Sequence, residues 1–534
     1  MGKLGGFLEV ERHGIPYRDA VKRAHDYKEF LLQRPTPELR EQGGRCMDCG
    51  VPFCHNGCPL GNLIPDWNDL VYRDRWPDAI AQLHATNNFP ELTGRLCPAP
   101  CEAACVLEIK EDDAVTIKQI ELAIVDRAWA EGWIVPLPPK RETGQAVAVV
   151  GSGPAGMAAA QQLRRLGHRV VLFERDEAAG GLARFGVPDF KIEKRIVERR
   201  AQQLLAEGVE LRCGVDVGQD ISAEELKAGF DAVVLATGSR VPRDLQVPGR
   251  ELEGVHFAMD YLYQRNRFVA GEVGPAPTVP APPAPGSEGS DPEISAAGKD
   301  VVVIGGGDTG ADCVGNALRE GASSIVQLEL LPEPPAHRPD ERTPWPQWPL
   351  KYRLSYAMEE ALKEGLGDQV YSIATTSFSD GGAGRTGRAG HVGALHIAQA
   401  ELAPPFGPVP GTERELPAQL VLLAMGFLCP EPGLLDQLGV QKDQRGNVKS
   451  VKPYTTSVEN VFAAGDARRG QSLIVWAINE GRQCARMVER YLAGKRGAGS
   501  DPGLPEDQGL PGHADADEGP EGPPQHVGPG VPAG

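Results

Sequence analysis

Seven of the chain's 11 cysteines fall between residues 46 and 105, and clustered thiols are the soft ligands that metal centres use. The first four are spaced C-x2-C-x4-C-x3-C-P and the other three C-x3-C-x3-C. A disulfide framework is disfavoured, because a long acidic chain without a secretory signal is expected in a reducing compartment. Structural zinc stays open, since C-x2-C is a common half-site. The first group is closest to the bacterial ferredoxin pattern and favours iron–sulfur ligation. The cysteines are Cys46, Cys49, Cys54, Cys58, Cys97, Cys101 and Cys105.

Ligand counting sharpens the iron–sulfur interpretation. Two [4Fe–4S] clusters take about eight protein ligands, and the segment offers seven thiols. In the ferredoxin pattern the cysteine before proline serves the other cluster, so Cys58 is expected to join the later group and one of that group to complete the first site. The eighth ligand stays open: a helix expected after Val115 brings Gln119 and Glu121 within reach, and His55 competes.

A dinucleotide-binding pattern follows the cysteine region. A buried strand is predicted over 146–150, then G-x-G-x-x-G from Gly151 to Gly156, a helix over 157–166 and a strand over 169–173. Glu174 ends that strand, 18 residues after Gly156. The glycines let backbone N–H groups approach a pyrophosphate at the positive end of a helix, and the acid accepts from a ribose hydroxyl. The full context makes this a strong signal.

A second unit of the same kind begins with a strand over 301–304, continues through Gly305 to Gly310, and has another strand over 324–328. A chain with two such units typically holds a flavin and a nicotinamide coenzyme, between which hydride passes. Because the first unit follows the cysteines directly, the flavin is expected nearest the clusters.

Two later segments support a flavin. A short buried strand predicted at 235–239 carries the Thr237-Gly238 turn, and a strand over 458–463 ends in Gly465-Asp466. A helix is predicted from Ser472 to 481. Asp466 could bond the ribityl or phosphate region, and the start of the helix could stabilise negative charge on the reduced ring.

In these motifs the chain resembles the small (beta) subunit of bacterial glutamate synthase, over residues 1 to about 492. The cysteine region, the Gly151–Gly156 motif, Gly180-Gly181-Leu182, the Gly305–Gly310 motif and Gly465-Asp466 occur in that order. Pro344-Trp-Pro-Gln-Trp-Pro349 also matches and is more discriminating than any of the nucleotide motifs. The same module recurs in dihydropyrimidine dehydrogenase. The resemblance implies an α/β fold in which a helical iron–sulfur domain precedes two Rossmann-like domains for FAD and NAD(P)H, in a glutathione-reductase-like arrangement.

The resemblance also implies a role: NADPH oxidation, hydride transfer to FAD, and single electrons through two [4Fe–4S] clusters to an FMN-containing large (alpha) subunit with a glutaminase. That partner would form L-glutamate from L-glutamine and 2-oxoglutarate. An alternative is the NAD(P)H-dependent reductase subunit of a ferredoxin- or pyrimidine-reducing system. No cysteine pair follows Gly181, which disfavours a disulfide reductase, and no side chain is predicted to be catalytic.

The resemblance implies one cluster on Cys46, Cys49, Cys54 and Cys105 and the other on Cys58, Cys97, Cys101 and Glu121. The gap between Cys97 and Cys101 differs from that of the related dehydrogenase, so the pairing stays open. The residues expected at the flavin are Gly151, Ser152, Gly153, Pro154, Ala155, Gly156, Glu174, Gly181, Leu182, Thr237, Gly238, Gly465, Asp466 and Ser472. Those expected at the coenzyme are Gly305, Gly307, Asp308, Thr309 and Gly310.

Coenzyme choice rests on Glu329, which ends the second strand of the later unit. An acid there favours NADH, because it binds the 2′-hydroxyl and repels a 2′-phosphate. Arg338 and Arg342 follow and could offset it. The resemblance implies NADPH, which we expect over NADH.

Composition narrows the setting. The chain has 534 residues and a formal net charge of −18, which disfavours a general nucleic-acid binder. No stretch approaches the ~18–20 apolar residues of a membrane span, and the first residues do not form a secretory signal. We therefore expect a cytoplasmic protein with neither nucleic acid nor membrane as a partner.

Five segments are expected. A helical cluster domain takes residues 1–140, with helices over 77–84 and 117–129. The FAD domain takes 145–255 and resumes over 415–492, around an NAD(P)H domain over 256–414. Within the latter, the Pro/Gly-rich segment 271–297 is expected to be an extended mobile loop, and 381–387 a flexible turn. The tail, 494–534, has too little apolar content to order and is expected to be disordered.

Overall fold

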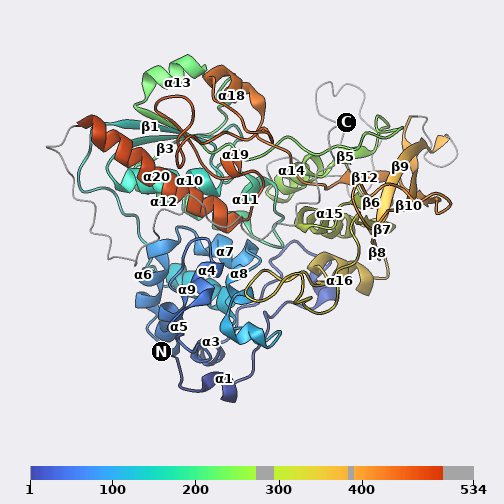
Figure 1. The fold of residues 1–534 in the computed structure, drawn as a ribbon, viewed down its shortest axis with the longest axis horizontal. Coiled ribbons are helices and arrows are strands. Elements are labelled where there is room, and N and C mark those ends of the chain that lie inside the picture. The colour runs from blue at the N-terminus through green and yellow to red at the C-terminus, as the bar shows by residue number, and fades with distance from the viewer. Residues whose placement is uncertain (1, 272–293, 383–389, 497–534) are drawn as a thin grey trace.

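The structure is a computed structural model, and it describes residues 2–271, 294–382 and 390–496. Figure 1 shows a helical N-terminal unit, in blue, below a parallel sheet with its helices, and a second parallel sheet to one side. We call these the cluster unit, the flavin unit and the coenzyme unit. Among the described residues, the structure has no helix long and apolar enough to span a membrane.

The cluster unit is built from short helices around a core that includes Trp67, Trp76 and Phe89, all almost completely buried. Five of these helices have a proline at their first or second residue. Proline favours a helix start, because the N–H that it lacks would have no partner within the helix at that position. The helices predicted over 77–84 and 117–129 correspond to α6 and α9. The elements are α1 (Gly6–Glu9), α2 (Ala20–Arg23), α3 (Thr36–Gly44), α4 (Phe53–Gly57), α5 (Ile64–Tyr72), α6 (Trp76–Thr86), α7 (Pro90–Leu96), α8 (Pro100–Ala103), the 3₁₀ turn Val106–Ile109 and α9 (Ile117–Ala130).

The flavin unit is a five-stranded parallel sheet in the order β13-β4-β1-β2-β3. Its central strands are continuous apolar runs, as expected for a sheet covered on both faces. The strand predicted at 235–239 instead ends at Leu235, and the residues after it form the turn. The strands are β1 (Ala146–Val150), β2 (Arg169–Phe173), β3 (Glu210–Arg212), β4 (Ala232–Leu235) and β13 (Val461–Ala463). The helices are α10 (Pro154–Arg165), α11 (Leu182–Phe185), α12 (Lys194–Ala206), α13 (Ala223–Gly229), α18 (Pro432–Leu438), α19 (Asp466–Arg469) and α20 (Ile474–Arg496).

The coenzyme unit has a second parallel sheet, in the order β5-β12-β6-β7-β8, and a three-stranded antiparallel sheet, β11-β10-β9. Its strands are β5 (Val255–Phe257), β6 (Asp300–Ile304), β7 (Ser324–Leu328), β8 (Gly367–Val370), β9 (Ile373–Asp380), β10 (Val392–Gln399), β11 (Arg414–Pro417) and β12 (Leu420–Leu423). Its helices are α14 (Ala258–Val269), α15 (Asp308–Arg319) and α16 (Tyr356–Lys363).

Two predicted boundaries were wrong. The FAD domain was expected to resume at 415, but β12 pairs in parallel with β5 and β6 and lies in the coenzyme sheet, where both faces of this apolar strand are buried. The tail was expected from 494, but α20 runs to Arg496, so its last turn includes that start. The predicted loop 271–297 lies outside the described residues over 272–293, the predicted turn 381–387 over 383–387, and the tail from 497 onward.

Buried ion pairs join the three units. Glu91 of α7 accepts from Arg200 of α12 at 2.6 Å, and Arg23 of α2 donates to Glu360 of α16 at 2.6 Å. All four side chains are buried, and paired charges are the form in which charge is tolerated there. The cluster unit is thereby held against both nucleotide units.

Candidate active site: two thiol sites and two dinucleotide loops

The seven clustered cysteines divide into two pockets. Cys46, after α3, Cys49, Cys54 in α4 and Cys105, after α8, line one pocket with Asn68 of α5, and we call these four cysteines the first thiol site. Burial raises the pKa of the Cys46 thiol to about 11 and raises that of Cys54 further, with the neighbouring thiols adding to the shift at Cys54. A positively charged group bound among these sulfurs would reverse that effect and favour the thiolates.

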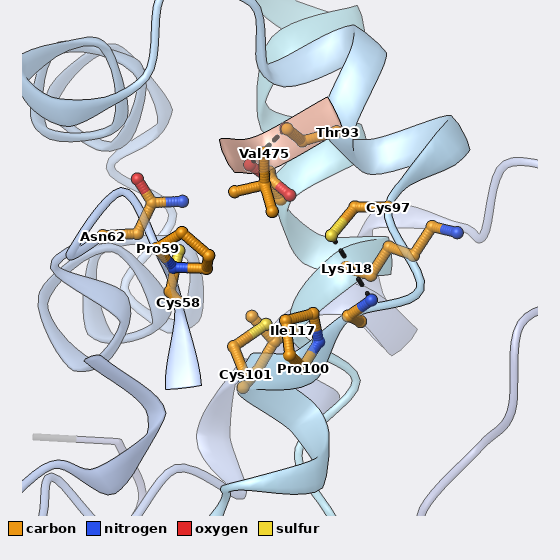
Figure 2. A pocket seen from close by; sticks show the side chains of 12 residues that line it. Cys58, Pro59, Asn62, Thr93, Cys97, Pro100, Cys101, Ile117, Lys118 and Val475 are labelled. Atoms are coloured by element: carbon orange, nitrogen blue, oxygen red, sulfur yellow. Dashed lines mark hydrogen bonds between the residues drawn. The ribbon is translucent and has the colours of Figure 1, made fainter. Parts of the chain in front are cut away.

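The second thiol site consists of Cys58, Cys97, Cys101 and Glu121, all buried. In Figure 2 the three cysteines surround one cavity, and Val475, near the start of α20, lies at its edge. Burial raises the pKa of Glu121 to about 7. Its Oε1 accepts from Asn87 Nδ2 at 3.0 Å and Thr93 Oγ1 at 2.9 Å, whereas Oε2 makes no hydrogen bond within the described chain. One oxygen is anchored and the other remains available.

Iron–sulfur groups fit both sites by the chemistry of the donors. The four cysteines of the first site and the three cysteines and one carboxylate of the second are donor sets of the size that a [4Fe–4S] cluster uses. Backbone N–H groups lie at the sulfurs as well: those of Leu107 and Val115 at Cys105, and that of Ala99 at Cys97, 3.4 Å away. Hydrogen bonds of this kind stabilise charged sulfur ligands. Within the described part of the chain, no three His, Cys, Asp or Glu side chains form a group that could hold a single metal ion.

The competing candidates for the eighth ligand lie elsewhere. Gln119 shares α9 with Glu121, but its Oε1 accepts from Arg34 Nε at 3.2 Å, and it lines neither thiol pocket. His55 also lines neither, and burial lowers its pKa. The grouping in the structure is therefore the one that the family resemblance implies. Ligation itself stays a prediction.

The flavin-unit loop has room where a pyrophosphate is expected. Gly151 has a φ of +99°, and a Cβ on Gly156 would lie 1.8 Å from the Gly151 carbonyl oxygen, so both positions demand glycine. A Cβ on Gly153, between them, would meet no atom within 4 Å. The loop is thus closed at both ends and open in the middle, at the start of α10, which begins at Pro154 and continues through Ala155. Anions bind at such helix starts.

Glu174 and Ser152 fix this loop from inside. Glu174 Oε2 accepts from Ser152 N at 2.9 Å and Ser152 Oγ at 2.6 Å, and Gly180 N donates to the same hydroxyl at 3.0 Å. A Cβ on Gly181, which precedes Leu182 in α11, would lie 3.0 Å from Gly153 Cα. The predicted ribose acid, the glycine loop and the Gly180-Gly181-Leu182 turn therefore meet at one place.

The returning segment reaches the same place. A Cβ on Gly465 would lie 2.8 Å from Ala155 Cβ, at the start of α10. Asp466 Oδ1 accepts from Ser472 Oγ at 2.6 Å, and burial raises the Asp466 pKa to about 6. Thr237 and Gly238 lie just after β4. The next residue, Ser239, donates through Oγ to the Asp466 carbonyl oxygen at 3.1 Å. All the residues predicted for the flavin are brought together.

The coenzyme loop repeats the same design. Gly305 has a φ of +125°, a Cβ on Gly310 would lie 2.2 Å from the Gly305 carbonyl oxygen, and one on Gly307 would meet nothing within 4 Å. Asp308 and Thr309 form the first turn of α15, directly after this opening. The predicted coenzyme residues thus lie together at one helix start.

Glu329 occupies the position in the coenzyme unit that Glu174 occupies in the flavin unit. Its Oε2 accepts from Gly306 N at 2.8 Å and its Oε1 from Leu331 N at 2.9 Å. Arg338, expected to offset this acid, donates through Nη1 to the carbonyl oxygens of Thr343 and Gln347. Arg342 is exposed.

Comparison with known proteins agrees with this geometry. The pyridine nucleotide-disulphide oxidoreductase family matches residues 145–481, more than half of the chain. The dihydropyrimidine dehydrogenase domain II, 4Fe–4S cluster family matches residues 23–133. By fold and site the chain is therefore an oxidoreductase of the pyridine nucleotide-disulphide family that carries an N-terminal iron–sulfur domain. These families imply FAD and NAD(P)H binding and a [4Fe–4S] cluster, and they confirm the predicted fold class.

Relatives narrow the class. The chain is 54% identical over 497 residues to the glutamate synthase [NADPH] small chain of Mycobacterium tuberculosis, covering 92% of this chain and 97% of that one. It is 47% identical over 511 residues to the Bacillus subtilis protein of that name, covering 92% and 99%. The chain therefore belongs to the glutamate synthase small-chain family. It is also 46% identical to glutamate synthase [NADH] of Schizosaccharomyces pombe, covering 94% of this chain but 23% of that longer one.

Sequence reasoning missed the residues that support the site from elsewhere in the fold. Asn87 and Thr93 hold Glu121, and Gly481 lets α20 pack against α10, since a Cβ there would lie 2.1 Å from the Ala155 carbonyl oxygen. Nothing local marks Asn87 or Thr93, whereas a glycine inside a predicted helix is a recognisable sign of close packing.

Proposed function

We propose that the chain is the electron-input subunit of glutamate synthase, which oxidises NADPH and delivers the electrons to an FMN-containing large chain that forms L-glutamate from L-glutamine and 2-oxoglutarate. The observation that carries the proposal is Val475. This residue belongs to the flavin-unit helix that follows Asp466 and Ser472, and it also lines the second thiol site. The predicted flavin position and one thiol site are therefore neighbours.

Different residues would bind the two nucleotide cofactors and the two iron–sulfur clusters. Gly151–Gly156, with Glu174, Asp466 and Ser472, would hold FAD, and Gly305–Gly310 would hold the coenzyme. When bound, a flavin takes a hydride from a nicotinamide, and iron–sulfur clusters carry the resulting electrons singly. The cluster unit supplies two donor sets that share no residue, so that two groups can be held without competing for ligands.

For the coenzyme we propose NADPH, which the names of the Mycobacterium tuberculosis and Bacillus subtilis relatives support. Glu329 is the residue that a 2′-phosphate would face at the end of β7. Its negative charge would repel that phosphate and so limit the preference for NADPH over NADH. Relatives named for NADH, at 46% and 42% identity, share this family.

For the partner we propose a separate large chain with FMN and glutaminase. The small-chain name of the bacterial relatives supports it. The yeast glutamate synthases support it as well. This chain covers less than a quarter of their length, and the remainder leaves room for the partner's activities in the same polypeptide.

Reconstitution tests this proposal. The purified chain is mixed anaerobically with a purified large chain of a bacterial glutamate synthase, and L-glutamate formed from L-glutamine and 2-oxoglutarate is measured against NADPH consumed. We expect about two glutamates per NADPH, with neither chain sufficient alone. The proposal is contradicted if NADPH is consumed with a dye as acceptor but the mixture yields no glutamate, and a ferredoxin- or pyrimidine-reducing role would then be tested.

A further inference from the structure

One segment of the coenzyme unit leaves its own sheet and lies against the cluster unit. We call residues 337–351, between β7 and α16, the strap (Figure 1, yellow beside the blue helices). Lys351 Nζ donates to Asp112 Oδ1 at 2.7 Å and Glu111 Oε1 at 3.2 Å. Glu111 also pairs with His337 Nδ1 at 3.1 Å. Both ends of the strap therefore contact Glu111 or Asp112, which follow the 3₁₀ turn after Cys105.

Trp345, in the middle of the strap, contacts two segments that carry cysteines of the first thiol site. Its Nε1 donates to the Cys105 carbonyl oxygen at 3.0 Å. Its ring packs on Phe53, with the ring centroids 4.7 Å apart and the planes at 48°. Phe53 immediately precedes Cys54, and 51 residues separate Cys54 from Cys105. One side chain thus bridges two thiol-bearing segments that are distant in sequence.

The strap is held in the shape that presents this tryptophan. Arg338 Nη1 donates to the carbonyl oxygens of Thr343, at 3.1 Å, and Gln347, at 2.8 Å, on either side of Trp345. Thr343 Oγ1 accepts from Leu350 N at 3.2 Å. A side chain positioned in advance loses less conformational entropy when it makes its contacts.

We propose that Trp345 is a positioning residue for the first thiol site: it clamps the segments of Cys54 and Cys105 together and excludes water from that edge, so that the coenzyme unit completes a metal centre of the cluster unit. The inference rests on the proposed function, because it requires a cluster on these thiols. Cys54, which follows Phe53, is only half-buried, so the edge that Trp345 adjoins is one at which cover matters. Solvent exposure of an iron–sulfur cluster also changes its reduction potential.

The test uses the full chain, with flavin and iron, in three variants. W345F keeps a ring against Phe53 but removes the N–H donor, and W345A removes both contacts. W348F is the matched control, because Trp348 lies in the same strap and packs on Arg353, with 4.6 Å between the guanidinium and the ring centroid. Iron and acid-labile sulfide per chain are measured before and during exposure to air, and the cluster potentials are measured by EPR titration. Flavin per chain reports whether the fold is intact.

We expect W345F to lose iron about fivefold faster than the unmodified chain, the effect of one hydrogen bond, and W345A to lose it faster still. The loss should stop at about half of the iron, and the potential of one cluster should shift, while W348F behaves like the unmodified chain. Equal rates and equal potentials in all chains would overturn the inference alone. An unmodified chain without iron and sulfide would overturn the proposed function as well.

Discussion

The role assigned to Glu121 gives a prediction that can be worked through from the structure. E121Q retains an acceptor for Asn87 and Thr93 but replaces the free carboxylate oxygen with an amide that cannot serve as an anionic ligand. E121A is less informative, because it removes the shared acceptor and the packing of a buried side chain together. Among the described residues, it leaves Asn87 Nδ2 with only Thr93 Oγ1 and Thr93 Oγ1 with only the Pro90 carbonyl oxygen as acceptors. E121Q therefore separates ligation from folding.

The magnitude follows from the two donor sets. They share no residue, so the loss of one ligand should empty one site and leave the other. We expect E121Q to hold about four iron atoms per chain, against about eight in the unmodified chain. The control is Q119A, on the same helix, which lines neither thiol pocket and should keep all eight.

The assay is iron and acid-labile sulfide per chain after anaerobic reconstitution, with EPR spin counting of the reduced protein. C105S should also halve the iron, and the E121Q C105S double variant should hold almost none. An E121Q chain with full iron and two unchanged EPR signals would refute the role of Glu121. Iron loss in Q119A instead would transfer that role to Gln119.

Four other variants test the dinucleotide sites. G156A should lose both its flavin and its thermal stability, because the added Cβ would overlap the Gly151 carbonyl. G153A should lose flavin but keep its melting temperature, because a Cβ there meets no atom within 4 Å. Flavin absorbance per chain and a thermal melt measure the two effects, and a G153A chain that keeps its full flavin content would count against the loop assignment. E329Q should raise kcat/KM for NADPH relative to NADH about tenfold, the effect of removing a like charge a few ångströms from the 2′-phosphate, and an unchanged ratio would show that Glu329 does not select the coenzyme. The Asp466 pKa is raised to about 6 from 3.8, so ionisation of this carboxyl costs the folded state about 3 kcal/mol, and the stability present below pH ~4 is lost as the pH rises through ~6. Flavin-free D466N should therefore gain stability relative to the unmodified apoprotein as the pH rises from ~4 to ~6, and a constant difference across that range would argue against a shifted pKa.

Local motifs made much of the site predictable. Gly156 and Gly310 are each fixed by a close approach to the first glycine of the same loop, within one strand–turn–helix unit, so they could be assigned from their neighbours in sequence. The cysteines identified the metal chemistry in the same way. These signals depend on a few adjacent residues, and the fold leaves them little freedom.

Long-range packing decided the rest. The apolar run Leu420–Leu423 predicts a strand but not the sheet that it joins, which depends on pairing with β5 and β6. Glu121 was preferred by resemblance, and only the packing of α9 beside α7 brings it to Thr93 and Asn87. Trp345 contacts the Cys105 carbonyl across 240 residues of sequence, and no local pattern could have indicated that contact.

An anaerobic titration of the purified chain with NADPH, followed by optical and EPR spectra, tests the central claim most directly. We predict that NADPH bleaches the flavin absorbance and that EPR signals of reduced iron–sulfur clusters then grow, in a chain with about eight iron and eight sulfide. A chain that oxidises NADPH through its flavin yet holds zinc, or neither iron nor sulfide, would contradict the assignment of an electron-input subunit.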